Sequence, residues 1–450
     1  MTSRLTFPKG FVWGAATSAY QIEGAAKVDG RGESIWDRFS KTRGKTFKGE
    51  TGEVACDHYH RFAEDVALMR ELGLQAYRFS VAWPRVIPEG AGPVNWLGID
   101  FYDRLVDTLL VAGIEPLITL FHWDLPQALQ DRGGWENRDT CAYFADYAAL
   151  MISRLGDRVK YWTTLNEPWV FAFLGYRSGE HAPGVKAESR AVQVAHNLLV
   201  GHGLAMRAMR ERRPNAQLGI TLSLWPTEPA TEKPEDIAAA EFEWQKDCGW
   251  LLSPLLNGCY PADVLRQYQQ LAPNVQPGDM ALIAQHMDLL GVNYYSRTLT
   301  TARGNISPVP GSEYTDMDWE VQAPALRRLL VRINKDYKCP PLWITENGCA
   351  YPDVVAADGQ VHDARRIKFF EEHLAQAHHA IADGVDLRGY FAWSLLDNFE
   401  WAHGYSKRFG LLYVDYPTLK RTIKDSGRWY SRVIQANGLE VSEPAAVGGR

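Results

Sequence analysis

The sequence is poor in cysteine and has no long apolar run. Six cysteines are spread over 450 residues and none forms Cys-x-x-Cys, which is far below the density of a disulfide scaffold. No stretch reaches the ~18 apolar residues that a membrane helix needs, and the first eight residues lack the apolar core of a signal peptide. We therefore expect a soluble, cytoplasmic protein without a membrane partner.

An excess of positive charge is also absent. The chain carries 48 Lys and Arg against 54 Asp and Glu, a net charge of −6, so no basic field attracts nucleic acid. The motifs G-x-G-x-x-G, G-x-S-x-G and H-E-x-x-H do not occur, which excludes simple cases of dinucleotide binding, an esterase and a zinc protease. His58 and His60 stand two positions apart at the start of a predicted helix and do not share a helix face. We expect no metal and no cofactor.

The composition is that of a folded globular protein. Hydrophobic residues make up 46% and charged residues 23%, close to ordinary averages. No linker, low-complexity tract or close repeat divides the chain, so residues 1–450 are predicted to form one domain. Aromatic residues, at 12%, offer flat faces that stack on sugars or cations.

Short apolar runs alternate with segments of helical periodicity. Eight runs read as buried strands, at residues 11–17, 74–80, 115–121, 161–166, 218–222, 289–294, 342–346 and 387–393. Helices are predicted between them, among others at 57–72, 140–155, 189–212 and 364–383, and left-handed glycines are expected at their ends, at Gly73, Gly113, Gly156 and Gly384. Eight such units predict an α/β protein with a single closed (β/α)8 barrel. An open, doubly wound sheet is the alternative.

Polar and aromatic residues cluster at the ends of these strands, where the catalytic groups of a barrel converge. Glu167 and Glu346 each follow or close an apolar run and lie 179 positions apart. Two carboxylates that flank one bond are what glycoside hydrolysis needs. The alternative, an ordinary salt bridge for each, does not explain why Asn166 and Arg78 accompany them. Arg78 is expected to keep the carboxylate of Glu346 ionised.

Several long motifs in order show that the chain resembles family 1 glycoside hydrolases, the β-glucosidase and β-galactosidase type with a (β/α)8 barrel. They are Phe11-Val-Trp-Gly-Ala-Ala-Thr-Ser-Ala-Tyr-Gln-Ile-Glu-Gly24, Thr164-Leu-Asn-Glu-Pro168, Ile344-Thr-Glu-Asn-Gly348, Trp393-Ser-Leu-Leu-Asp-Asn-Phe-Glu-Trp401 and Phe409-Gly-Leu-Leu-Tyr-Val-Asp415. The resemblance implies that Glu346 is the nucleophile and Glu167 the acid/base. It also implies a retaining mechanism, with carboxyl groups about 5–5.5 Å apart.

The same resemblance implies a pocket for the sugar ring. It maps onto Gln21, His122, Trp123, Asn166, Asn293, Tyr295, Glu346, Trp393, Glu400 and Trp401. Tyr295 and Arg78 are expected to keep Glu346 anionic, while the pKa of Glu167 is expected to lie higher. An anionic Glu400 is expected to repel the phosphate of 6-phospho sugars.

On the leaving-group side, the resemblance implies contacts from Trp169, Phe173 and Trp319. The segment 319–326 departs from the family pattern, which usually has Pro and then Gly two residues later. The sequence thus predicts a retaining β-glucosidase with β-galactosidase or β-fucosidase tolerance, acting on a small β-glucoside or oligosaccharide. Net transglycosylation, a 6-phospho-β-glycosidase and a non-catalytic sugar-binding barrel are the alternatives. The oligomeric state is open, and a homo-oligomer is compatible with the sequence.

Overall fold

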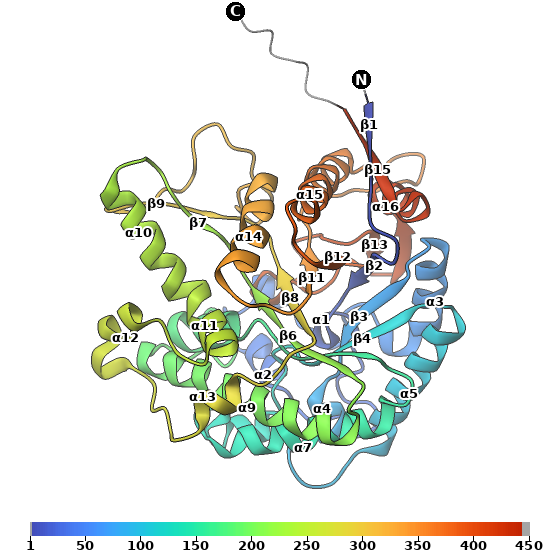
Figure 1. The fold of residues 1–450 in the computed structure, drawn as a ribbon. Helices are drawn as coiled ribbons and strands as arrows, with labels where there is room; N and C mark the ends of the chain where they lie inside the picture. Colours follow the sequence, from blue (N-terminus) through green and yellow to red (C-terminus); the bar gives the residue numbers. More distant parts are fainter. Residues whose placement is uncertain (1, 443–450) are drawn as a thin grey trace, which may run out of the picture.

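A closed barrel of eight parallel strands forms the centre of the computed structural model, which describes residues 2–442 (Figure 1). Around the barrel the strands are β2 (Val12–Ala16), β3 (Ala76–Ser80), β4 (Glu115–Phe121), β5 (Tyr161–Asn166), β6 (Gln217–Ser223), β8 (Leu289–Asn293), β11 (Leu342–Asn347) and β12 (Leu387–Trp393). β12 pairs with β2 and closes the ring. The predicted (β/α)8 barrel is therefore confirmed, and the open sheet is wrong.

These strands form a barrel because their apolar residues are covered on both faces. All five residues of β3 and of β8 are buried, as are six of the seven residues of β4. Helices cover the outer face and side chains fill the interior, which is why the runs are nearly continuous in apolar residues rather than alternating. At Gly14 on β2 a Cβ atom would lie 2.5 Å from the ring of Phe391, so only glycine admits that ring inside the barrel.

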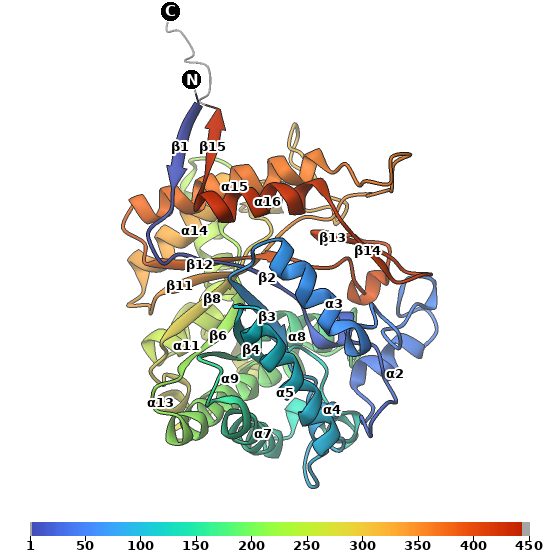
Figure 2. The same cartoon turned by 90° about the vertical axis from the view of Figure 1, so that its right-hand side faces the viewer.

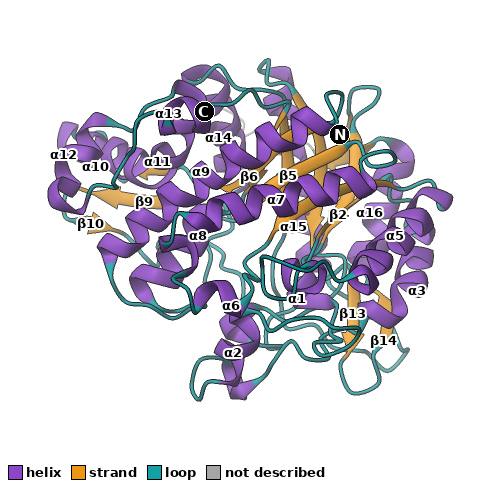
Figure 3. Cartoon of the chain, turned by 90° about the horizontal axis from the view of Figure 1, so that it is seen from below, coloured by secondary structure: helices purple, strands orange, loops and turns teal. Residues whose placement is uncertain are grey.

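The outer layer consists of helices that follow the strands (Figures 2 and 3). Its principal members are α3 (His58–Glu71), α5 (Trp96–Val111), α7 (Asp139–Leu155), α9 (Glu188–Arg212), α14 (Ala323–Asp336), α15 (Ala364–Ala382) and α16 (Asp425–Ala436). Shorter helices lie in the connections: α1 (Ala19–Ile22), α2 (Ile35–Lys41), α4 (Trp83–Val86), α6 (Gln127–Gln130), α8 (Pro168–Ala172), α10 (Pro234–Trp244), α11 (Trp250–Asn257), α12 (Ala262–Tyr268) and α13 (Asp279–Ile283). The four helices named from the sequence are confirmed within one residue at each end.

The glycines at helix ends divide into two kinds. Gly73, Gly113 and Gly384 have φ of +72°, +76° and +92°, as predicted for left-handed C-terminal residues. The prediction for Gly156 is wrong, because its φ is −73°. A Cβ at Gly156 would lie 2.4 Å from the carbonyl oxygen of Ile152. Glycine is needed there for close approach and not for handedness.

Three small sheets extend the barrel. β1 (Thr2–Thr6) pairs antiparallel with β15 (Gly438–Ser442), so the two ends of the described chain lie side by side (Figure 2). β7 (Thr227–Pro229), β9 (Thr298–Thr301) and β10 (Gly304–Asn305) form a second sheet, and β13 (Leu412–Asp415) with β14 (Lys420–Ile423) a hairpin. Within residues 2–442 no helix combines the length and apolar character needed to span a bilayer.

Candidate active site

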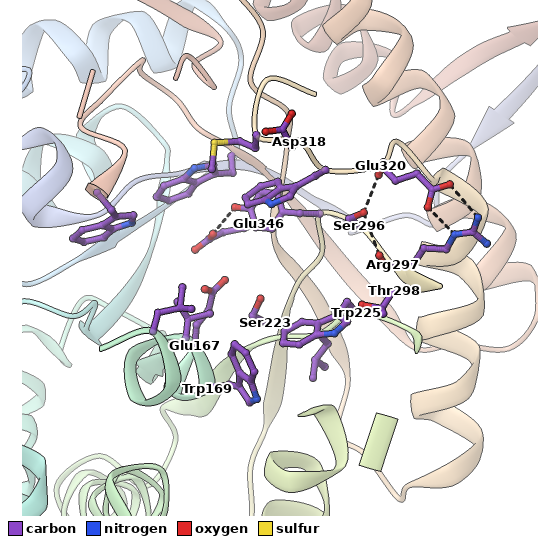
Figure 4. A pocket seen from close by; sticks show the side chains of 18 of the residues that line it. Glu167, Trp169, Ser223, Trp225, Ser296, Arg297, Thr298, Asp318, Glu320 and Glu346 are labelled. Carbon is purple, nitrogen blue, oxygen red and sulfur yellow. Dashed lines mark hydrogen bonds and ion pairs between the residues drawn. The ribbon is translucent and has the colours of Figure 1, made fainter. Parts of the chain in front are cut away.

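One large cavity opens at the carboxyl ends of the barrel strands, with a volume of about 640 Å³ (Figure 4). Residues that the sequence places after different strands meet there. The cavity is lined by His122, Trp123, Asn166, Glu167, Trp169, Tyr295, Trp319, Glu346, Trp393, Glu400 and Trp401. Three more predicted residues stand directly behind this lining, namely Gln21, Arg78 and Asn293, and hydrogen bond to it.

Glu346 lies on β11 with both carboxylate oxygens engaged. Oε1 accepts a charged hydrogen bond from Arg78 Nη1 at 2.5 Å, and Oε2 accepts one from the hydroxyl of Tyr295 at 2.7 Å. Burial raises the pKa of Glu346, while Arg78 and Tyr295 oppose that rise. The carboxylate is thus held in place and paired with a guanidinium that is itself fully buried.

Glu167 is also buried but lacks a cation of its own. Its Oε1 accepts a hydrogen bond from Asn293 Nδ2 at 2.6 Å, and no ion pair to it forms among residues 2–442. Burial and the nearby charge of Glu346 raise the pKa of Glu167 to about 8. The two carboxyl groups therefore differ in the direction expected for a proton donor and a nucleophile.

Asn166 connects the two carboxyl groups. Its Oδ1 accepts hydrogen bonds from Arg78 Nη2 at 2.7 Å and from Asn293 Nδ2 at 3.1 Å, and its Nδ2 lies 3.0 Å from Nε2 of His122. The network joins β3, β5 and β8 with His122, which directly follows β4, and it leaves each amide with a single orientation. Such a network holds the groups around a substrate without loss of entropy on binding.

Glu400 forms the outer edge of the same site, next to Gln21. Gln21 Nε2 donates to Asn398 Oδ1 and to the carbonyl of Phe399, and lies 3.5 Å from Glu400 Oε2. Burial and the charge of Glu346 raise the pKa of Glu400 to about 8. The raised pKa favours the neutral form of this carboxyl, and the repulsion of a phosphate by Glu400 stays a prediction.

A pocket for the phosphate of a 6-phospho sugar would need a cation near Glu400. The two cations that follow Glu400 in the sequence are engaged elsewhere: Lys407 donates to the carbonyl of Asp316, and Arg408 pairs with Asp397 at 2.7 Å. Phosphate recognition normally uses Arg or Lys as donors. Neither cation lines the cavity.

Four residues that line the cavity adopt a left-handed backbone, one of them Asp318 with φ of +57°. Trp123, Glu167 and Trp401 have φ of +77°, +48° and +47°, a region in which bulky side chains are uncommon. The indole of Trp123 donates to the carbonyl of Asn166 at 2.9 Å, and its ring lies 4.6 Å from that of Trp401. Strain of about 1–3 kcal/mol per residue is typical of functional sites that the surrounding fold holds in shape.

The outer half of the cavity has aromatic walls. Trp169 on α8 meets Trp225 nearly at right angles, with ring centres 4.9 Å apart, and Trp319 packs on Tyr295 at 4.9 Å. Phe173 does not line the cavity, contrary to prediction, because it is 1% exposed and packs behind Trp169 at 5.0 Å.

Sequence reasoning missed several lining residues of this outer half. Trp225 stands just beyond the end of β6, so the same strand-end rule could have found it. His181 and the loop residues Ile306, Ser307 and Val309 belong to segments without periodicity, and no signal in the sequence indicates them. Among residues 2–442 no group of three or more His, Cys, Asp or Glu side chains is arranged to hold a metal ion.

Two buried carboxyl groups with opposite electrostatic surroundings, facing one cavity with polar and aromatic walls, meet the requirements for cleaving a glycosidic bond. The fold and site together define a glycoside-hydrolysing barrel enzyme. The model of glycosyl hydrolase family 1 matches residues 3–439. The chain belongs to this family, whose members are retaining enzymes.

The relatives match nearly the whole chain. Beta-glucosidase A of Acetivibrio thermocellus is 49% identical over 447 residues, spanning 97% of this chain and 100% of the relative. A bifunctional beta-D-glucosidase/beta-D-fucosidase of Bifidobacterium breve is 45% identical, over 96% and 98% of the two chains. The structure of a beta-glucosidase from Thermotoga maritima in complex with glucoimidazole superposes with a TM-score of 0.94 at 48% identity, covering 96% of this chain and 100% of that one.

Proposed function

We propose that this enzyme is a β-glucosidase that removes terminal, non-reducing β-D-glucosyl residues from small glucosides and short oligosaccharides, cellobiose included, with tolerance for galactosyl and fucosyl residues. The observation that carries the proposal is the difference between the two carboxyl groups. Glu346 is paired with Arg78, whereas Glu167 has only an amide partner. The relatives named above, at 45–49% identity over nearly the whole chain, support the choice of sugar.

In the first step, Glu346 attacks the anomeric carbon and Glu167 gives its proton to the departing oxygen. The raised pKa of Glu167 keeps that proton in place at neutral pH. Asn166 stands between the two carboxyl groups, in reach of the 2-hydroxyl of the sugar. A hydrogen bond at that position strengthens in the transition state.

In the second step, Glu167 must act as a base toward water. Once Glu346 is esterified, its negative charge disappears, and this charge is one of the causes that raise the pKa of Glu167. The pKa of Glu167 is therefore expected to fall in the glycosyl-enzyme, so that the group ionises when a base is required. Arg78 and Tyr295 are then free to stabilise the carboxylate of Glu346 as it leaves.

Recognition of the glycone falls to the remaining lining groups. Trp393 offers a flat face to the C–H side of the ring, while Gln21, His122 and Glu400 bind outer hydroxyls. A protonated Glu400 can both donate and accept, which accommodates a hydroxyl in more than one orientation. This supports activity on sugars that differ at one hydroxyl.

The test is hydrolysis of p-nitrophenyl β-D-glucoside by the wild type, Glu346→Ala and Glu167→Ala, with and without azide. We expect each variant to lose at least about 10⁴-fold and 10²-fold activity respectively. Azide should restore Glu346→Ala with an α-glucosyl azide product and Glu167→Ala with a β-glucosyl azide product. The same stereochemistry in both variants would overturn the assignment of roles, and an inactive wild type that still binds glucose would indicate a sugar-binding protein.

A further inference from the structure

The wall of the cavity that carries Trp319 is a hairpin-like loop, residues 312–321, which is held to the barrel by an ion-pair cluster. Arg297, just before β9, donates to Glu320 through Nε at 2.9 Å and through Nη2 at 3.0 Å. Ser312 Oγ donates to the same carboxylate at 2.6 Å. Figure 4 shows this pair at the end of the cavity, with Arg297 turned away from the glutamates at the opposite end.

The cluster is electrically balanced and partly buried. Arg297 Nη1 also donates to Glu228 on β7 at 2.7 Å, and Arg328 on α14 donates to Glu228 at 2.5 and 3.0 Å. Glu320 is only 5% exposed, and Arg297 holds the pKa of this carboxyl below its usual range in spite of burial. The guanidinium groups of Arg297 and Arg328 thus balance the carboxylates of Glu228 and Glu320. The cluster connects the loop 312–321 to β7, to α14 and to the residue before β9.

The same two chain segments also meet through their neighbouring residues. Ser296 Oγ donates to the carbonyl of Glu320 at 2.9 Å, while Tyr295 packs against Trp319 at 4.9 Å and donates to Glu346. The three consecutive residues 295–297 therefore all contact the two consecutive residues 319–320. These contacts hold the Trp319 ring against Tyr295 at the cavity wall.

We propose that Arg297 and Glu320 are positioning residues that hold Trp319 as a wall for the leaving group and so determine which aglycones the enzyme cleaves efficiently. This inference rests on the proposed function. Both residues border the cavity, but each guanidinium nitrogen of Arg297 and each carboxylate oxygen of Glu320 already has a partner within the cluster, so we assign them to holding the loop. Their effect must pass through the loop.

A kinetic signature separates this role from a general structural one. The aglycone is present only in the first step and has left before the glycosyl-enzyme reacts with water. A displaced Trp319 should therefore slow cleavage of substrates with large aglycones and leave the second step unchanged. β-D-Glucosyl fluoride has a leaving group too small to reach Trp319, so its cleavage should also be unaffected. Tyr295 keeps its own partners, Glu346 and Phe409, and Glu346 should stay oriented.

The experiment compares the wild type with Arg297→Met, Glu320→Gln and the double variant. Arg327→Met is the matched control, because Arg327 on α14 forms a bidentate pair with Asp383, at the end of α15 and away from the loop. For cellobiose and p-nitrophenyl β-D-glucoside we expect kcat/KM to fall about tenfold in Arg297→Met and somewhat less in Glu320→Gln. For glucosyl fluoride kcat/KM, and for 2,4-dinitrophenyl β-D-glucoside kcat, should stay within about twofold.

The double variant tests whether the two residues act together. Removing both charges leaves no unpaired buried ion, so its loss should not exceed that of Arg297→Met alone. Equal losses for all substrates, or losses that multiply in the double variant, would overturn the proposal. So would unchanged kcat/KM for cellobiose and p-nitrophenyl β-D-glucoside in all three variants.

Hydrogen exchange provides a readout that does not depend on activity. Amides of residues 312–321 should exchange at least about tenfold faster in Arg297→Met than in the wild type or in Arg327→Met, because their fastening is lost. Unchanged exchange would contradict the positioning role. If the wild type hydrolyses no β-glucoside, the proposed function fails, while hydrogen exchange still decides whether the loop is held in this way.

Discussion

The two halves of the cavity are built differently. The inner half, around Glu346, consists of side chains on strand ends whose polar atoms are paired with one another in a buried network. The outer half, around Trp319, consists of aromatic rings on loops and short helices, with exposed carboxylates at its rim. The proposed chemistry thus lies on the barrel strands, and the proposed contacts to the leaving group lie on loops and short helices.

The largest effect that would test this comparison is expected from Arg78→Met in the inner half. Without the guanidinium, Glu346 is a buried carboxyl with a single hydroxyl partner, so its pKa rises and the nucleophile is neutral at neutral pH. We expect kcat/KM for p-nitrophenyl β-D-glucoside to fall about 10²- to 10³-fold and the acidic limb of the pH profile to move upward. Arg78→Lys, which keeps a charge, should lose less. A profile of unchanged shape would show that Arg78 does not control Glu346.

A second test concerns the proton on Glu167. Because the first step needs this group protonated and its pKa is about 8, kcat/KM should decline as pH rises through about 8, by about tenfold for each further pH unit. On the acidic side, activity should decline as Glu346 becomes protonated. In Glu167→Gln, measured with 2,4-dinitrophenyl β-D-glucoside, whose leaving group needs no acid, the alkaline decline should vanish. Its persistence would assign that limb to another group.

Truncation in the outer half should have a smaller and more selective effect. Trp225→Ala removes one face of the corner that it forms with Trp169. An aromatic contact of about 0.5–1.5 kcal/mol corresponds to about two- to tenfold in kcat/KM for p-nitrophenyl β-D-glucoside. Trp225→Phe should retain most of the activity. If the loss were equally large for glucosyl fluoride, the two halves would not be independent.

The smallest effect is expected from charge at the rim. Glu180 and Asp318 line the opening, are exposed, and form no ion pair within residues 2–442. At low salt, the ratio of kcat/KM for 4-carboxyphenyl to 4-carbamoylphenyl β-D-glucoside should rise about two- to threefold in Glu180→Gln. Glu71→Gln, on the exposed end of α3, is the control. An unchanged ratio, or a rise that persists in 1 M salt, would show that the negative charge at the rim does not affect binding of charged aglycones.

Prediction from sequence succeeded where the signal is local. The strands at 115–121, 161–166 and 387–393 were identified to the residue, since buried parallel strands are continuous apolar runs bounded by polar residues. The small sheet of β7, β9 and β10 was not foreseen. β10 has two residues and β7 three, too few for periodicity to appear.

Site prediction followed the same division. Residues at strand ends were found because a barrel brings all strand ends together. The contact between Arg297 and Glu320, which we propose holds Trp319 in place, was not predicted. That contact joins positions 23 apart, and Glu320 lies in the segment that departs from the family pattern. An arginine and a glutamate at such a separation leave no recognisable pattern in the sequence. The misplacement of Phe173 has a similar cause, since position along a short helix does not determine which face meets the cavity.

The sequence by itself determined the barrel, through eight apolar runs separated by helical segments, and the two carboxylates at the ends of its fourth and seventh strands. Only the tertiary structure decided how these carboxylates differ. Arg78, which pairs with Glu346, lies 268 positions away from it, and the charge states of Glu167 and Glu400 depend on burial beside that paired carboxylate. A pKa depends on solvation and on charges within a few ångströms, and these neighbours come together only when the barrel closes.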